Sequence, residues 1–153
     1  MVKILFVCHG NICRSTMAQC VFTDLAARSG AADRFVIDSA ATSTEEIGNP
    51  IYPPAARKLR EKGVPILPHR ARQITERDYK EFDLIVAMDE YNLRNLRRRL
   101  PDTAGKYRLL LDFTDRPGEV ADPWYTGNFD ETYEDVVKGC KGLLEAVKER
   151  KFF

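Results

Sequence analysis

The 153-residue sequence contains no apolar run that approaches the roughly 20 residues needed for a membrane-spanning helix. Its first apolar stretch, residues 4–8, is shorter than the about 7–15 apolar residues of a secretory signal, and His9 and Asn11 interrupt any extension. We therefore expect no transmembrane helix and no signal peptide, and we interpret the N-terminal residues as a first β-strand.

The sequence also lacks an excess of charge of either sign. Its 24 Lys and Arg residues balance 23 Asp and Glu residues, leaving a net charge of +1. This balance predicts neither a nucleic acid nor another polyanion as a partner. The one basic cluster, residues 94–100, falls in a helical stretch and is interpreted as a solvated helix face without a functional role.

Cysteine is scarce, because only Cys8, Cys13, Cys20 and Cys140 are present and their spacing is uneven. Secreted disulfide scaffolds carry more cysteines at closer spacing, so the pattern predicts a cytoplasmic protein with reduced thiols. Cys20 and Cys140 fall on apolar helix faces and are interpreted as core residues. The other two cysteines remain free for chemistry.

Strand-like and helix-like segments alternate along the chain, without an internal repeat or a linker. The alternation predicts one domain over residues 1–153 with a three-layer α/β fold, a doubly wound four-stranded parallel sheet with helices on both faces. Two long loops, at residues 42–54 and 114–130, are rich in turn residues. The expected strands cover residues 2–8, 34–40, 83–88 and 106–113, and the expected helices cover residues 15–30, 54–63, 74–83, 89–100 and 131–151.

Residues 7–15, VCHGNICRS, connect the first strand to the first helix, where ligands bind in folds of this class. A zinc site would need a ligand beyond Cys8, His9 and Cys13, and the first two are adjacent, so that their side chains diverge. A thioredoxin-like redox motif has two residues between its cysteines instead of four. A Walker loop needs a second Gly and a Lys. We therefore expect no metal and no cofactor.

A cysteine nucleophile inside an anion-binding loop uses every feature of the stretch. A helix N-terminus and a nearby cation both stabilise a thiolate, and Arg14 supplies a guanidinium that can pair with two phosphate oxygens at once. Gly10 and Asn11 tolerate left-handed backbone angles, which would let the N–H groups of the loop turn inward. Ser15 can donate its hydroxyl to the Cys8 thiolate or cap the helix.

Cleavage of a phosphate ester also needs a general acid for the leaving oxygen. Among the carboxylates near the loop at residues 114–130, only Asp122 precedes a proline, which restricts its backbone to extended angles. Two aromatic residues, Trp124 and Tyr125, follow. A rigidly presented acid beside apolar walls suits an aryl phosphate, and the competing interpretation is a solvated acidic loop.

The sequence resembles the low-molecular-weight protein tyrosine phosphatases over essentially its whole length. The resemblance rests on VCHGNICRS, on DPWY at residues 122–125, and on DSAATS, HRARQIT and FDLIVAMDEYNL in order between them. It implies a four-stranded parallel sheet and metal-independent hydrolysis of phosphotyrosine proteins or small aryl phosphates, with inorganic phosphate as product. Cys8 would attack phosphorus and form a cysteinyl phosphate, Arg14 would stabilise the transferred group, and Asp122 would serve first as acid and then as base.

The resemblance also implies supporting roles. Asn11 would hold the shape of the loop, Ser15 would stabilise the Cys8 thiolate, and His69 would support the loop from behind. Cys13 would form a reversible disulfide with Cys8 and protect it from over-oxidation, or fill space behind the phosphate, and both can hold together. The phosphate-binding residues would be Cys8, His9, Gly10, Asn11, Ile12, Cys13 and Arg14, with the His9 side chain at the loop surface.

Three positions depart from the family pattern. Thr16 replaces a usual proline, and it can form a capping box with Gln19 instead. Glu45 or Glu46 stands at the pocket wall where related enzymes can carry an aromatic residue, so substrate preference is open. Trp124 replaces a tyrosine and preserves the aromatic wall that it shares with Tyr125.

Three alternatives share parts of this pattern. Arsenate reductases on the same fold relay electrons through further cysteines in a later segment, and residues 69–83 contain none. Arginine phosphatases resemble this loop but carry Thr at the position of Ile12, so Ile12 favours phosphotyrosine. A non-catalytic anion-binding module would need neither a thiolate nor Asp122.

Overall fold

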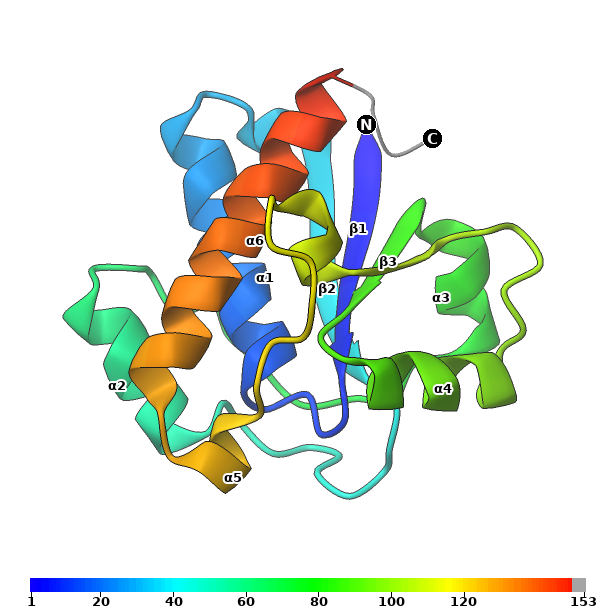
Figure 1. The fold of residues 1–153 in the computed structure, drawn as a ribbon, viewed down its shortest axis with the longest axis horizontal. Coiled ribbons are helices and arrows are strands. Elements are labelled where there is room, and N and C mark those ends of the chain that lie inside the picture. The colour runs from blue at the N-terminus through cyan, green and yellow to red at the C-terminus, as the bar shows by residue number, and fades with distance from the viewer. Residues whose placement is uncertain (150–153) are drawn as a thin grey trace.

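Four parallel strands in the order β2-β1-β3-β4 form the centre of the computed structural model, which describes residues 1–149 (Figure 1). Parallel pairing follows from the helices that separate consecutive strands, since a strand must cross over before it can pair in the same direction. The predicted α/β fold with a four-stranded parallel sheet is confirmed. The strands are β1 Val2–Cys8, β2 Phe35–Ala41, β3 Leu84–Ala87 and β4 Tyr107–Leu109.

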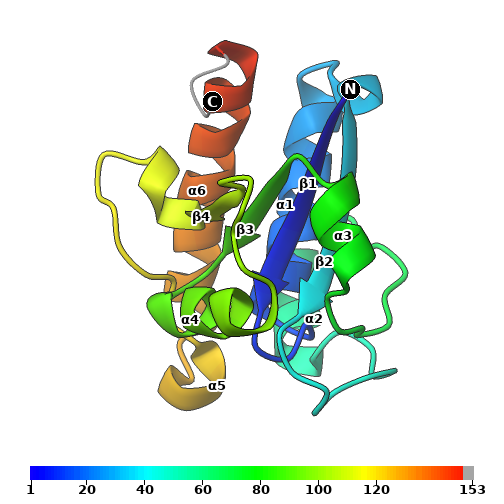
Figure 2. The same ribbon diagram turned by 90° about the vertical axis from the view of Figure 1, so that its right-hand side faces the viewer.

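Helices cover both faces of this sheet, and the residues of β1 alternate between the two resulting cores (Figures 1 and 2). Ile4 and Phe6 pack with residues of the helices on one face, whereas Leu5 and Val7 pack on the other. Helices α1 Arg14–Arg28, α2 Pro53–Glu61 and α6 Phe129–Glu149 lie on the first face, and α3 Glu76–Glu81 and α4 Glu90–Arg99 on the second.

Helix boundaries follow local signals in the sequence. Helix α2 begins at consecutive prolines, which suit the first turn because a proline lacks an N–H there. Helix α4 begins with a capping box, in which the Asp89 carboxylate accepts a hydrogen bond from Asn92 N at 2.8 Å. Within residues 1–149, no helix combines the length and the apolar character that crossing a membrane requires.

The fourth strand is shorter than predicted. Residues 106–113 were expected to be one strand, but β4 ends at Leu109 and the turn η2, Leu110–Phe113, follows. The cause is close packing on α6, where a Cβ at Gly139 would lie 2.4 Å from Leu110 Cγ and one at Gly142 would lie 2.0 Å from Phe113 O. The chain turns here because the two glycines let it approach the helix backbone.

The loop at residues 114–130 is more ordered than predicted, because it contains the short helix α5, Pro123–Thr126. Gly127, with φ +70°, ends α5, and α6 begins at Phe129 instead of residue 131. Asn128 Oδ1 accepts a hydrogen bond from Glu131 N at 3.0 Å within this first turn. The predicted end of the last helix, residues 150–151, lies outside the described residues.

Candidate active site

The loop after β1 opens where the sheet order reverses. Strand β2 pairs with one edge of β1 and β3 with the other, so Cys8 at the carboxyl end of β1 lies at this reversal. Crossover helices diverge at such a point and leave a crevice for a ligand. In Figure 1 the loop lies at the lower end of β1, the same end of the molecule as α5.

Asn11 determines the shape of this loop. Its φ of 59° makes it the one non-glycine residue in the left-handed region among residues 1–149, and its side chain is completely buried. Asn11 Nδ2 donates to Ser15 Oγ at 2.9 Å, and Asn11 Oδ1 accepts from Arg72 N at 3.2 Å. Gly10 does not adopt the left-handed angle expected of it; instead, a Cβ there would lie 3.3 Å from Glu46 Cγ.

Two further side chains hold the loop from behind. His69 Nε2 donates to Asn11 O at 2.5 Å, and Thr16 Oγ1 donates to the same oxygen at 3.2 Å. The predicted capping box of Thr16 and Gln19 is therefore wrong. Helix α1 begins at Arg14, which places Thr16 inside the first turn, and Gln19 Oε1 accepts from Ser39 Oγ at 2.6 Å.

Cys8 is buried, with 3% of its surface exposed, and its sulfur lies 3.1 Å from Ser15 Oγ. Because Asn11 Nδ2 already donates to Ser15 Oγ, the hydroxyl hydrogen of Ser15 is free to point at the sulfur. A thiolate at Cys8 would therefore accept a hydrogen bond from Ser15, in addition to the favourable potential at the start of α1.

Arg14 is almost fully buried, with 3% of its surface exposed, and is held by three oxygens. Its Nη1 donates to Asp89 Oδ2 at 2.7 Å and to Val120 O at 2.9 Å, and its Nη2 lies 3.4 Å from Asp122 Oδ2. Burial acts to lower the pKa of the Arg14 guanidinium, but the Cys8 sulfur and the two carboxylates outweigh it and raise that pKa. Arg14 is therefore a permanent cation beside the sulfur.

Asp122 faces the loop because it caps α5. Its Oδ1 accepts from Trp124 N at 3.0 Å, which leaves Oδ2 near Arg14. Pro123 explains this arrangement, since it restricts Asp122 to the extended angles observed, φ −80° and ψ 112°, and starts the helix. The Asp-Pro pair thus restricts the backbone, and the hydrogen bond from Trp124 N orients the carboxylate.

A hollow of about 150 Å³ lies above the Cys8 sulfur and brings the predicted residues together. The predicted nucleophile, cation and acid line it, together with the predicted rim. Three supporting residues, Asn11, Ser15 and His69, are not among the lining residues and contact the loop from behind. The lining residues are Cys8, His9, Gly10, Ile12, Cys13, Arg14, Glu45, Glu46, Asp122, Trp124 and Tyr125.

The rim of this hollow carries both aromatic and acidic residues. Trp124 and Tyr125 are 59% and 84% exposed, and the Trp124 ring lies 5.0 Å from that of Tyr52. Of the acidic residues of the rim, Glu45 has its Oε2 2.9 Å from His9 Nε2. A flat aromatic group entering the hollow would meet apolar faces, and a cationic group would meet carboxylates.

Cys13 lines the same hollow and remains a protonated thiol. Burial raises its pKa, and the neighbouring Cys8 and Asp122 raise it further, while Arg14 acts in the opposite direction. All four cysteines are free, and Cys20 and Cys140 are buried in the core as predicted.

Two residues of the site were missed by the sequence analysis. Asp89, which pairs with Arg14, directly follows the strand at residues 83–88, and its position at the carboxyl end of a neighbouring strand could have identified it. Tyr52 supports both the loop, by donating from its N–H to Ile12 O at 2.8 Å, and the Trp124 ring. No sequence signal marks Tyr52, because it lies in an irregular segment.

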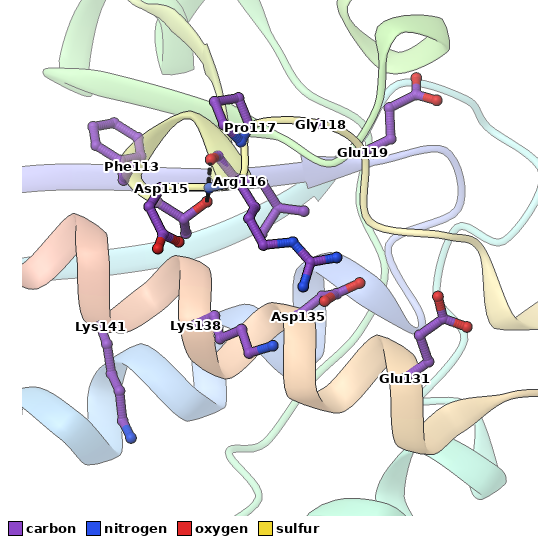
Figure 3. Close-up of a pocket in the computed structure, with 12 residues that line it drawn as sticks. Phe113, Asp115, Arg116, Pro117, Gly118, Glu119, Glu131, Asp135, Lys138 and Lys141 are labelled. Atoms are coloured by element: carbon purple, nitrogen blue, oxygen red, sulfur yellow. Dashed lines mark hydrogen bonds between the residues drawn. The ribbon is translucent and has the colours of Figure 1, made fainter.

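A larger hollow, of about 710 Å³, lies elsewhere, between η2 with the following loop and α6 (Figure 3). Its lining mixes acidic and basic residues, and Arg116 extends from the loop toward Asp135 on α6 (Figure 3). No cysteine lines it. Among residues 1–149, no group of three or more His, Cys, Asp or Glu side chains is arranged to hold a metal ion.

Comparisons with known proteins agree on one family. The family model described as low molecular weight phosphotyrosine protein phosphatase matches residues 3–152. The low molecular weight protein-tyrosine-phosphatase YfkJ of Bacillus subtilis is 39% identical over 99% of each chain, and its crystal structure superposes with a TM-score of 0.94, covering 99% of this chain and 97% of that one. The Gallus gallus low molecular weight phosphotyrosine protein phosphatase is 40% identical over 94% of each chain. The structure of a Drosophila arginine phosphatase superposes with a TM-score of 0.87 at 27% identity, covering 96% of this chain and 98% of that one.

Proposed function

Because the chain belongs to the low molecular weight phosphotyrosine protein phosphatase family, we propose that it hydrolyses phosphotyrosine through a covalent phosphate on Cys8. The protein is a protein-tyrosine-phosphatase, and therefore a hydrolase. One observation carries the assignment of residues: Cys8, Arg14 and Asp122 line the same hollow of about 150 Å³.

In the first step, the Cys8 thiolate attacks phosphorus, and a sulfur–phosphorus bond forms as the bond to the phenolic oxygen breaks. Asp122, protonated, gives its proton to the departing oxygen, so that tyrosine leaves as a neutral phenol. Arg14 binds the oxygens of the transferred group, and its contact with Asp89 fixes the plane of the guanidinium before the substrate arrives. Ser15 stabilises the thiolate.

In the second step, Asp122 is a carboxylate and takes a proton from water as the water oxygen attacks phosphorus. The sulfur–phosphorus bond breaks, the Cys8 thiolate is regenerated and inorganic phosphate is released. Every proton that leaves one group in the cycle is accepted by another. The position of Asp122 beside the hollow supports both roles, because leaving oxygen and attacking water occupy the same side of phosphorus.

The substrates proposed are phosphotyrosine proteins and small aryl phosphates. The aromatic residues of the rim, Trp124 and Tyr125, support this choice, because a phenol ring can stack there. We further propose that residues 1–153 form a single phosphatase domain that acts in the cytoplasm, where Cys8 stays reduced.

Purified protein should hydrolyse p-nitrophenyl phosphate without added metal, and Cys8→Ser should not, whereas Cys20→Ser in the core should keep its activity when folded. Mass spectrometry of a rapidly quenched reaction should find phosphate on Cys8. Activity that survives Cys8→Ser would overturn the proposal.

Phosphoarginine is the second substrate to test, because a Drosophila arginine phosphatase shares the fold and Glu45 and Glu46 line the rim. We expect a preference for phosphotyrosine, which Ile12 favours. Parallel assays with phosphotyrosine, phosphoarginine and arsenate distinguish the three activities. Ile12→Thr should move the ratio of the two phosphatase activities toward phosphoarginine.

A further inference from the structure

A second hollow of about 390 Å³ lies beside the catalytic hollow and shares one wall with it. His9 lines both. The second hollow is formed where residues 42–43, after β2, approach α4, and its lining includes Thr42, Tyr91, Asn95, Arg98 and Arg99. We refer to it as the basic subsite. A peptide whose phosphotyrosine occupies the catalytic hollow and whose chain extends across His9 would pass this opening.

Two polar atoms at the basic subsite are buried without a hydrogen-bond partner. They are Thr42 Oγ1 and His9 Nδ1, neither of which has a partner among residues 1–149. Thr42 is 9% exposed, so its hydroxyl cannot exchange freely with bulk water. Buried polar groups in native proteins are almost always paired, with the chain, with water or with a ligand. The Thr42 hydroxyl beside this hollow therefore gains a partner when a polar group binds there and the threonine side chain rotates toward it.

The charged side chains that line the basic subsite are all positive. Arg98 and Arg99 contribute guanidinium groups, and no Asp or Glu among residues 1–149 lines the hollow. Arg98 forms no ion pair with the described residues, and Arg99 uses only Nε, which lies 3.3 Å from Ile74 O. Glu45, which contacts the shared wall, is paired with His9 Nε2 and lines the catalytic hollow instead.

The larger hollow of Figure 3 differs from the basic subsite in the charges that line it. There, Arg116, Lys138 and Lys141 are interspersed with four carboxylates, and no buried polar atom lacks a partner in its lining. At the basic subsite the cations have no such counter-charge. Free guanidinium groups beside an unpaired hydroxyl suit an anion with two oxygens.

We propose that the basic subsite binds the carboxylate of an acidic residue that flanks the phosphotyrosine in a peptide substrate. The Arg98 guanidinium donates to the carboxylate, the Thr42 hydroxyl rotates toward it and donates a second hydrogen bond, and the exposed Tyr91 ring covers the methylene groups of the acidic side chain. The inference rests on the proposed function, since it needs a phosphotyrosine in the neighbouring hollow. It assigns a role to part of the basic cluster at residues 94–100, which the sequence analysis interpreted as a solvated face.

The test uses phosphotyrosine peptides in which a single glutamate is moved through the three positions before and after the phosphotyrosine, in a background of alanine. One position should raise kcat/KM over the all-alanine peptide by about fivefold, as expected for an ion pair near the surface. Arg98→Glu should abolish that gain, and a lysine at the same peptide position should then restore it. Thr42→Val should reduce the gain without reversing it.

Arg94→Glu is the matched control, because Arg94 is an exposed arginine of the same helix that does not line the hollow. It should leave the glutamate gain unchanged, and all three variants should hydrolyse p-nitrophenyl phosphate like the parent protein. If the parent protein did not hydrolyse p-nitrophenyl phosphate, the proposed function would be refuted, and not the subsite alone. A glutamate gain that survives Arg98→Glu, or the absence of a gain at every position, would overturn the subsite.

Discussion

The two segments that supply the reacting groups are held in very different ways. The loop from Cys8 to Arg14 is buried and fixed by hydrogen bonds that converge on Asn11 from several elements. The segment at residues 114–122, which carries the acid, is largely exposed. Its hydrogen bonds to other elements are few: Glu119 accepts from Glu90 N, Val120 bonds to Met88 and Arg14, Ala121 accepts from Thr132, and Asp122 lies beside Arg14.

This difference corresponds to the chemistry of each group. Sulfur and guanidinium must meet a phosphoryl group in one geometry, so a preorganised cradle lowers the barrier before any substrate binds. Asp122 serves two partners in turn, the leaving oxygen and then water. A carboxylate on a lightly held segment can follow both, and it still starts beside Arg14.

The largest expected effect concerns the cation of the rigid loop. Arg14→Lys keeps the charge but loses the fork that binds Asp89, Val120 and phosphate together, so kcat should fall by about a hundred- to a thousandfold. Steady-state kinetics with p-nitrophenyl phosphate measure this, with the exposed Arg94→Lys as control. A kcat close to the parent value would show that charge alone suffices and that the geometry of the cradle matters less than argued.

The next effect concerns the acid and depends on the substrate. Asp122→Asn can still accept the hydrogen bond from Trp124 N, so α5 should persist. Turnover of phenyl phosphate, whose phenol is a poor leaving group, should fall by about a hundredfold. Turnover of p-nitrophenyl phosphate, whose phenolate leaves without a proton, should fall much less in the first step. The first step is isolated by measuring the release of the phenol before the cysteinyl phosphate is hydrolysed, and an equal loss of that rate for both substrates would assign Asp122 to positioning instead of proton transfer.

A smaller effect tests whether Asn11 stabilises the loop. Asn11→Ala removes the hydrogen bonds to Ser15 and from Arg72 but keeps the left-handed angle, and should lower the free energy of unfolding by about 2–3 kcal/mol. Asn11→Gly removes the same bonds without backbone strain and should cost about 1 kcal/mol less. Urea unfolding compares the two, with Asp122→Ala as a variant of the lightly held segment. Equal stability of Asn11→Ala and the parent protein would contradict the contrast drawn between the segments.

The smallest effect on basal activity is expected for Cys13→Ser, which preserves the volume of the side chain in the loop. Its consequence should appear under oxidation, because a sulfenic acid on Cys8 would find no thiol to condense with. Peroxide-treated parent protein should recover activity with a dithiol reductant, and the variant should recover little. Recovery of both to the same extent would leave Cys13 as filler behind the phosphate.

Much of this arrangement could be predicted because the responsible signals are local. The spacing of Cys8 and Arg14 between a strand and a helix places both groups in one loop, and the Asp122–Pro123 pair places a carboxylate at the start of α5. Asn11 carries its left-handed tolerance in its own side chain.

The remaining features depend on contacts between distant segments, which no local pattern records. Asp89 reaches Arg14 only because β3 pairs with β1. Strand β4 ends early because α6 packs against the residues that follow it. The capping-box pattern at Thr16 is present in the sequence, but α1 already begins at Arg14 and the Thr16 hydroxyl donates to Asn11 O instead.

The close approach of α6 to η2 has a consequence for which positions tolerate substitution during evolution. If every position were substituted in turn and activity measured, Gly139 and Gly142 should tolerate as few replacements as Cys8. Neither glycine has a functional group, and neither lines the catalytic hollow. Replacing either one would displace Leu110 or Phe113, and with it the start of the segment that delivers the acid. Selection for proton transfer by Asp122 would therefore also constrain two glycines of α6. A ranking of positions by invariance alone would wrongly assign these two packing residues to the catalytic site.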